Sequence, residues 1–409
     1  MSDTWAPMPD DSGFNLFNLP VGVARFGDGR TTVVTRIGDD VLPLSDALDG
    51  RSEQAVGDRG LVDSASTDGL LASGPATWMR VRERTIDFLT DEANERPLTS
   101  AADVDMLLPM TVGDYVDFYS SLHHATNLGR LFRPDVDPLL PNWRHLPVGY
   151  HGRSATVAVS GTPVVRPTGL VTVGDDVLRR PSAALDFELE VGFVMGPGNP
   201  SGQQIEPDQA GEHVFGVVLV NDWSARDIQA FEYQPLGPFL GKSFLTTVSP
   251  WIIPLDALTG HLVTPPEQDP LPDPLLTAHR PWGLDLELTV HIGTTEVTRT
   301  NFRHLYWTFA QQLAHLTSNG AITRPGDLFA SGTVSGPTPG ECGSMIEATW
   351  RGRDPLLLDD GTERAWLNDG DTVTMSGWCG GVDDQPRIDF GHAVGTVQPA
   401  NRPVVTGGS

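Results

Sequence analysis

Lys242 is the only lysine in this chain, and every other basic side chain among its 27 lysines and arginines is an arginine. It lies in the segment Gly241-Lys242-Ser243-Phe244, which has glycine and proline on either side and therefore predicts a shaped loop. Lysine carries a compact ammonium group whose pKa responds to burial, whereas the guanidinium of arginine is planar and permanently charged. The lone ammonium indicates a chemical role for Lys242, and the alternative is a surface lysine present by chance.

Three acidic residues, Asp186, Glu188 and Glu190, alternate with apolar residues between Leu185 and Phe193. In an extended strand, alternate side chains share one face and lie about 6–7 Å apart. Taken alone, this alternation is typical of a strand with one solvated face. Only its context favours a metal site.

A further carboxylate, Asp222, follows the apolar residues 215–220, which predict a fully buried strand. A carboxylate at the mouth of a buried strand is costly unless it is paired or holds a cation. Residues 113–127 add Asp117 and the adjacent histidines His123 and His124. If this segment is helical, Asp117 and His124 share a face about 10 Å apart.

Four carboxylates from separate segments are therefore candidates to surround one hard cation: Asp117, Glu188, Glu190 and Asp222. Ligation by oxygen alone favours Mg²⁺, Ca²⁺ or Mn²⁺ over zinc. The two histidines beside them are candidate general bases.

The elements that must position these residues are expected in two domains, over residues 1–109 and 110–409. In the first, short β-branched segments alternate with turn residues and predict hairpins, with a helix near residues 78–88. In the second, dense glycine and proline separate strand-like segments, which favours a complex, mostly antiparallel β fold over a doubly wound sheet or a TIM barrel. An apolar stripe predicts one clear helix over residues 302–318, ending at Asn319-Gly320.

The composition excludes several classes of partner. A net charge of −26 over 409 residues argues against nucleic acid and against anionic membranes. No segment approaches the roughly 18 apolar residues of a membrane span, and the acidic first residues are unlike a signal peptide. Cys342 and Cys379 lack metal-site spacing and are expected to be packing residues in a reducing compartment. A cytoplasmic protein is predicted.

Six motifs occur in order along the chain, at residues 113–127, 140–153, 186–190, 221–229, 235–243 and 330–336. Together they resemble the fumarylacetoacetase family over essentially the whole second domain, and residues 18–23 resemble that family's N-terminal start. The resemblance implies a mainly β protein with some α structure: a small SH3-like β-barrel domain over residues 1–109 and a larger mixed β-roll catalytic domain over residues 110–409. It also implies a homodimer that hydrolyses the carbon–carbon bond of 4-fumarylacetoacetate to fumarate and acetoacetate, the last step of tyrosine degradation.

The resemblance also implies roles for individual residues. The metal ligands would be Asp117, Glu188, Glu190 and Asp222, with Lys242 and Thr246 near the metal, which is expected to be Mg²⁺ or Ca²⁺, with Mn²⁺ possible. His124 would be the general base, Glu347 would orient it, and Arg226, Gln229 and Lys242 would face the developing oxyanion. Substrate would be held by Tyr119, Arg133, Tyr150, Gln229, Tyr233 and Thr333.

Some alternatives stay open at the level of sequence. His123 is a second candidate base, and Cys342 stands where members of the family tend to carry an aromatic residue. A sibling activity on the same scaffold, such as acylpyruvate hydrolysis or decarboxylation or hydration of a keto acid, is the nearest functional alternative. A calcium-binding scaffold without turnover is a different class, but no EF-hand loop is present in the sequence.

Overall fold

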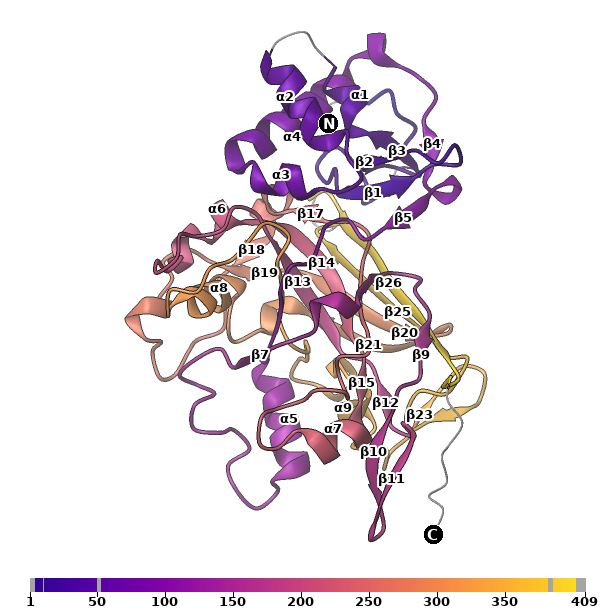
Figure 1. Ribbon diagram of the computed structural model, residues 1–409, viewed down its shortest axis with the longest axis vertical. Coiled ribbons are helices and arrows are strands. Elements are labelled where there is room, and N and C mark those ends of the chain that lie inside the picture. The colour runs from indigo at the N-terminus through magenta and orange to yellow at the C-terminus, as the bar shows by residue number, and fades with distance from the viewer. Residues whose placement is uncertain (1–3, 10, 50–52, 382–384, 402–409) are drawn as a thin grey trace.

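The N-terminal part of the chain forms an antiparallel sheet covered by helices, at the top of Figure 1. The computed structural model describes residues 4–9, 11–49, 53–381 and 385–401. The sheet has the order β4-β3-β2-β1-β5 and includes the expected hairpin between β2 and β3. Its strands are β1 (Val21–Arg25), β2 (Thr31–Ile37), β3 (Asp40–Pro43), β4 (Thr99–Ser100) and β5 (Asp105–Leu107).

Helices are more numerous in this part than the sequence predicted. The expected helix is present as α4 (Pro75–Thr90), with a proline in its first turn. The additional helices are α1 (Leu44–Ala47), α2 (Glu53–Val62) and α3 (Asp68–Ala72). The first and third of these are too short for a clear apolar period, and α2 has a weak one, so local pattern did not reveal them.

The rest of the chain is built around a large mixed sheet with the strand order β7-β6-β22-β13-β14-β16-β8, in which β17 also pairs with β14. Most pairs are antiparallel, but β22–β6 and β16–β8 are parallel. The central strands β13 and β14 are buried along their whole length. For β14 the continuous apolar sequence before Asp222 predicted this burial. The strands are β6 (Tyr115–Phe118), β7 (Gly149–His151), β8 (Val157–Val159), β13 (Leu189–Met195), β14 (Val214–Asp222), β16 (Thr246–Val248), β17 (Ile253–Pro254) and β22 (Leu328–Ala330).

A second sheet, of order β21-β20-β25-β26-β9, lies beside the first (Figure 1), and residues of both contribute to one apolar core. Its strands are β9 (Val164–Val165), β20 (Glu287–Ile292), β21 (Thr295–Asn301), β25 (Thr372–Cys379) and β26 (Ile388–Gln398). Four two-stranded pieces complete the β structure: β10 (Thr168–Val173) with β11 (Asp176–Pro181), β12 (Leu185–Asp186) with β15 (Ser224–Ala225), β18 (Leu262–Val263) with β19 (Gly283–Leu284), and β23 (Leu356–Leu357) with β24 (Glu363–Arg364). The mainly β fold class is therefore confirmed.

The helix predicted over residues 302–318 is shorter than expected. A 3₁₀ turn covers Phe302–His304, and α8 begins only at Phe309 and ends at Thr317. Thr308 starts α8 through a reciprocal capping box with Gln311, which is why the chain is not helical across that point. The other helices of this part are α5 (Leu122–Phe132), α6 (Ala210–His213), α7 (Arg226–Glu232) and α9 (Met345–Ala348).

In the described residues, no helix is both long enough and apolar enough to cross a lipid bilayer.

Candidate active site

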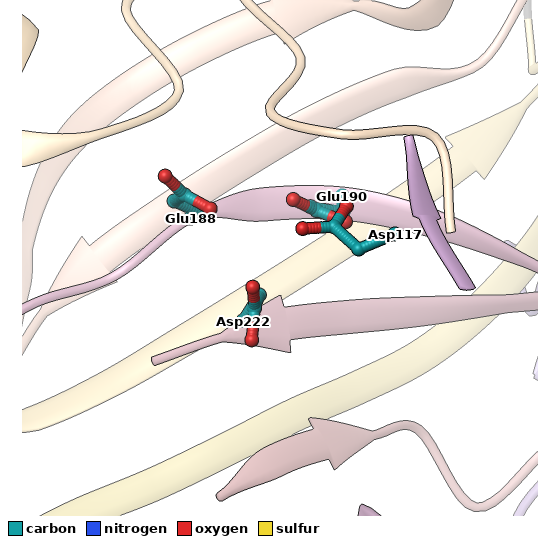
Figure 2. A group of neighbouring side chains, drawn as sticks. All are labelled: Asp117, Glu188, Glu190 and Asp222. Atoms are coloured by element: carbon teal, nitrogen blue, oxygen red, sulfur yellow. The ribbon is translucent and has the colours of Figure 1, made fainter. Parts of the chain in front are cut away.

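The four predicted carboxylates meet at one place in the large sheet. Each contributes an oxygen atom, and these four atoms all lie within 4.8 Å of one another. Figure 2 shows the side chains converging from neighbouring strands, with Asp117 and Glu190 side by side and Asp222 approaching from the adjacent strand. The carboxylate cluster is therefore Asp117, Glu188, Glu190 and Asp222, and all four residues are buried.

Strand register explains how residues so distant in sequence come together. Glu190 lies in β13 opposite Val220 of β14, and the backbone N–H of Asp222 donates to the carbonyl oxygen of Glu188 at 3.2 Å. The short strand β22 ends at Ala330, directly opposite Asp117 of β6. The acidic alternation around Glu188 thus faces the protein interior, and the solvated face that is usual for such a pattern is not found here.

The polar atoms of the cluster show that it suits a cation. Both carboxylate oxygens of Glu190 and Oδ1 of Asp117 are buried without a hydrogen-bond partner among the described residues. Burial raises the pKa of Glu190, and the nearby carboxylates of Asp117 and Asp222 raise it further. Buried oxygens without donors are costly unless a positive charge compensates them. The cluster can therefore hold a divalent cation, and its all-oxygen donor set suits a hard one.

Lys242 lies in the predicted loop, between α7 and β16, and its ammonium group points into the cluster. Its Nζ atom donates to Oδ2 of Asp222 at 2.7 Å and also contacts Oε2 of Glu188. Burial alone would lower the pKa of Lys242, but Asp222 and Glu188 outweigh that effect and raise it, so the ammonium stays charged. Lys242 is only 6% exposed and lies beside the cluster. The alternative that it is a surface lysine present by chance is therefore wrong.

Two further predicted residues contact Asp222. Thr246, the first residue of β16, donates its hydroxyl to Oδ1 of Asp222 at 3.2 Å. Tyr150, in β7, donates its hydroxyl to Oδ2 at 3.3 Å. A cavity of about 120 Å³, lined in part by Tyr150, Asp222, Phe239 and Lys242, opens beside this group.

Arg226 approaches the cluster from the first turn of α7. Its Nη2 lies 2.8 Å from Oε1 of Glu188, its Nε donates to Asp186 at 2.8 Å, and its Nη1 donates to Oε1 of Gln229 at 3.3 Å. Although burial alone raises the pKa of Glu188, the charges of Lys242 and Arg226 outweigh it and bring the pKa to about 2. Glu188 is therefore ionised at neutral pH.

His124 lies in the first turn of α5, where Ser121 caps the helix by accepting the backbone N–H of His124. Asp117 belongs to strand β6, so the condition that one helix carries both Asp117 and His124 is not met. Residues 115–118 form a strand because they pair in parallel with β22, which lies far away in the sequence. The chain then turns at residues 119–121 before the helix begins.

The imidazole of His124 is held by Glu347, which lies in α9. His124 Nδ1 is 2.6 Å from Oε2 of Glu347, and both residues are buried. That carboxylate also accepts hydroxyl hydrogen bonds from Ser335 at 2.9 Å and Ser344 at 2.7 Å, and an amide hydrogen bond from Asn127 at 3.0 Å. A carboxylate surrounded by donors is ionised, so Nδ1 of His124 donates to it, and in the neutral imidazole Nε2 is then the acceptor.

The other candidate base is arranged differently. The ring of His123 lies against the ring of His304, with 6.2 Å between centroids. His123 is half-buried, and burial lowers its pKa, with the charge of His304 contributing. The carboxylate of Glu347 thus holds His124 and not His123.

The predicted substrate residues are only partly assembled. Tyr119 packs edge-on against the His124 ring at 5.3 Å, while Gln229 and Tyr150 contact Arg226 and Asp222 as described above. Arg133 follows α5 and donates to the carbonyl oxygen of Pro138. Thr333 is buried in the loop after β22, whereas Tyr233 is 48% exposed at the end of α7 and its hydroxyl accepts a hydrogen bond from Gln234.

Several supporting residues were not predicted from the sequence. Asn127, Ser335 and Ser344 hold the carboxylate of Glu347, yet none of them was a candidate. Asn127 lies one helical turn after His124 and Ser344 lies three residues before Glu347, so short-range spacing was the available signal. Ser335 has no such signal. Both cysteines are buried, as expected of packing residues.

The depressed pKa of Glu347 leads to a prediction about stability. Burial alone raises this pKa, but His124 and the hydrogen-bond donors outweigh it and lower the pKa below its usual value of 4.5. The unfolded chain therefore binds this proton at a higher pH than the folded protein does. The stabilisation is present above the unfolded pKa and is lost as the pH falls through the folded pKa.

We expect the melting temperature of the wild type to fall more steeply than that of Glu347→Gln as the pH is lowered from about 6 to about 3. Differential scanning calorimetry of the two proteins in matched buffers measures the difference. Parallel curves would show that Glu347 is not held as an ion.

Solved structures share this fold. Fumarylacetoacetate hydrolase from psychrophilic Exiguobacterium antarcticum superposes with a TM-score of 0.55 at 15% identity, covering 93% of this chain and 99% of that one. Maleylpyruvate hydrolase from Sphingobium sp. SYK-6 gives a TM-score of 0.51 at 16% identity, covering 93% and 100%. At these identities the likeness shows the fold alone. Combined with the carboxylate cluster and the His124–Glu347 pair, the fold defines an enzyme suited to metal-assisted acid–base chemistry.

The particular family follows from sequence comparison. A family model described as fumarylacetoacetate (FAA) hydrolase C-terminal matches residues 115–398, and one described as fumarylacetoacetase N-terminal matches residues 17–109. The chain belongs to the fumarylacetoacetase family. It is 45% identical over 416 residues to fumarylacetoacetase of Bos taurus, covering 97% of this chain and 99% of the relative. The human protein of that name is 44% identical over 419 residues (98% and 100% covered), and that of Arabidopsis thaliana 41% over 419 residues (95% and 97%).

Proposed function

We propose that this chain is a hydrolase that cleaves 4-fumarylacetoacetate to fumarate and acetoacetate. The observation that supports this most strongly is the buried carboxylate cluster beside a histidine held by a glutamate, in a chain 41–45% identical over nearly its whole length to proteins named fumarylacetoacetase. The substrate is a β-diketone, and its hydrolysis needs an activated water, polarised carbonyl groups and a place for the charge of a departing carbanion.

The carboxylate cluster would hold the cation through Asp117, Glu188, Glu190 and Asp222, next to Lys242 and Thr246. We propose Mg²⁺ or Ca²⁺, with Mn²⁺ also compatible, because oxygen ligands accept all three. When bound, this ion would supply Lewis acidity that polarises the diketone.

His124 is assigned the general base. Its Nε2 takes a proton from water, and the water oxygen forms a bond to the fumaryl carbonyl carbon as the π electrons of that carbonyl move onto its oxygen. Glu347 stabilises the imidazolium through Nδ1. The oxyanion then re-forms the C=O bond while the bond from that carbon to the adjacent methylene breaks, and the electron pair of the broken bond moves onto the methylene carbon, conjugated with the neighbouring keto group. The imidazolium returns its proton to this carbon, which gives acetoacetate, and the new carboxylic acid releases its proton to solvent, which gives fumarate.

The positive side chains are assigned to charge that develops during the reaction. Arg226, Gln229 and Lys242 would face the oxyanion. Arg226 and Lys242 both contact Glu188, and Gln229 accepts a hydrogen bond from Arg226. The substrate is itself an anion that approaches a protein of net charge −26, so a local positive pocket is required. Tyr119, Arg133, Tyr150, Gln229, Tyr233 and Thr333 are proposed to hold its ends, and Tyr233 would have to turn inward from its exposed position.

Wider features of the enzyme are also part of the proposal. These are a place in tyrosine and phenylalanine degradation, a cytoplasmic location, a homodimer without nucleic-acid or membrane partners, and a division into an SH3-like domain over residues 1–109 and a catalytic domain over residues 110–409. The net charge of −26 supports the absence of nucleic-acid partners.

The assay that tests the function compares substrates. Purified, metal-loaded protein should turn over fumarylacetoacetate with a kcat/KM far above that for an acylpyruvate or a keto acid. A higher kcat/KM for the acylpyruvate would replace the proposed substrate by the sibling activity. Cation binding without turnover of either compound would indicate a scaffold.

Lys242→Arg keeps the charge but replaces a compact ammonium with a larger planar group. Lys242 is buried between Glu188 and Asp222, so guanidinium cannot occupy the same position without moving the carboxylates. We expect kcat to fall at least roughly tenfold in Lys242→Arg and in Lys242→Met, because a displacement of about 1 Å can cost about 10²-fold in rate. Steady-state kinetics, with metal content and melting temperature as controls, measure this. Near-native turnover in the arginine variant would show that Lys242 contributes only its positive charge.

A further inference from the structure

Asp186 is a fully buried carboxylate just outside the carboxylate cluster, at the end of β12. Three protein donors bond to it. Arg226 Nε donates to Oδ2 at 2.8 Å, the backbone N–H of Ile346 donates to Oδ2 at 3.0 Å, and the backbone N–H of Met345 donates to Oδ1 at 2.7 Å. These bonds join β12, α7 and α9, which are far apart in the sequence.

The donors belong to the two halves of the proposed chemistry. Besides Asp186, Arg226 contacts Glu188 and Gln229. These two residues belong to the side of the site assigned to the metal and the oxyanion. Met345 and Ile346 open α9, and the next residue along the chain is Glu347, which holds the general base. One carboxylate thus contacts both halves.

The short helix α9 depends on this contact for its N-terminus. It has four residues, and its N-cap residue, Ser344, makes no side-chain capping bond because the hydroxyl donates to Glu347 instead. The first backbone N–H groups of a helix need acceptors, and Asp186 provides them from another element.

We propose that Asp186 is a positioning residue that fixes Glu347 and Arg226 in one frame, so that the base and the oxyanion donors keep their relative placement during the reaction. This inference rests on the proposed function. Asp186 acts through other residues, because it is fully buried and both of its oxygens bond to protein donors. A merely structural role would affect stability and leave turnover of the folded protein unchanged.

Asp186→Asn tests the proposal. All partners of Asp186 are donors, so the amide NH₂ of asparagine must face one of them, and that contact is lost. We expect kcat to fall about 10- to 100-fold with KM changed by less than about threefold, because the binding groups remain while the reacting geometry loosens. The matched control is Asp208→Asn, since Asp208 also accepts backbone N–H groups, from His279 and Arg280 at 3.1 Å, and belongs to neither half of the site. This control should lower the melting temperature and leave kcat unchanged.

A double-mutant cycle with Glu347→Gln shows whether Asp186 acts through Glu347. If it does, the double variant should lose little more activity than the worse single variant. The proposal would be overturned if the fold-losses in kcat of the two single variants multiply in the double variant, or if Asp186→Asn leaves kcat unchanged. If Asp186→Asn does not fold, the cycle between Arg226→Lys and Glu347→Gln probes the same bridge, with non-multiplying losses expected and multiplying losses contradicting it.

Proton NMR of the substrate-free protein separates this inference from the proposed function. The Nδ1 proton shared by His124 and Glu347 should give a downfield signal in the wild type and in Asp208→Asn, and this signal should be weakened by faster exchange in Asp186→Asn. An unchanged signal overturns the positioning role. If the wild type does not hydrolyse fumarylacetoacetate, the proposed function fails, and this signal still decides the role of Asp186.

Discussion

Replacing His124 with alanine is expected to lower kcat by about 10² to 10⁴, with a modest change in substrate affinity, because that range is typical of the loss of a general base. His124 is the histidine that Glu347 holds, at 2.6 Å, with its Nε2 left free as an acceptor. Steady-state kinetics at saturating cation measure the loss. Glu347→Gln should show a smaller version of the same defect.

The adjacent histidine provides the matched control. His123→Ala removes the same side chain one position earlier, where the ring packs against His304. It should retain turnover close to that of the wild type. A dead His123→Ala variant together with a fully active His124→Ala variant would move the base to His123.

Removing divalent cations is expected to abolish turnover and to lower stability. Without a cation, both oxygens of Glu190 and Oδ1 of Asp117 stay buried with no partner, among like charges. Adding Mg²⁺ or Ca²⁺ to dialysed protein should restore activity and raise the melting temperature. A free cation concentration of 100 times the Kd adds about 2.7 kcal/mol to the free energy of unfolding. Glu190→Gln should weaken cation binding, as measured by isothermal titration calorimetry.

Glu92→Gln controls for the loss of one negative charge, because Glu92 is exposed in the N-terminal part. Its affinity for the cation should match that of the wild type. Full turnover in excess chelator, with metal-free protein verified by elemental analysis, would contradict the assigned role of the cluster.

The elements that sequence predicted well are those set by local pattern. The continuous apolar sequence of β14 dictates a buried strand, and it places Asp222 at the end of that strand. Strand β6 was not recognised, because its four residues are too few for a clear period and its parallel partner β22 lies far along the chain. The helix predicted from Phe302 was too long because apolar residues before Thr308 are buried in the core without belonging to the α-helix.

The candidate site was predictable in its charged residues more than in their partners. Asp117, Glu188, Glu190 and Asp222 could be grouped because carboxylates beside buried strands require compensation. The role of Asp186 was not visible, since two of its three donors are backbone N–H groups, which every sequence position offers alike. Tyr233 is exposed because of where α7 ends relative to the rest of the fold. The identity of the residue alone does not predict that position.

The central claim is that water adds to the fumaryl carbonyl of fumarylacetoacetate and that acetoacetate departs as a carbanion. Its most direct test is turnover in H₂¹⁸O by the metal-loaded wild type, with both products analysed by mass spectrometry. The account predicts fumarate with one ¹⁸O atom in a carboxylate and acetoacetate whose carboxylate is unlabelled. Unlabelled fumarate, label in the acetoacetate carboxylate, or the absence of both products would contradict it.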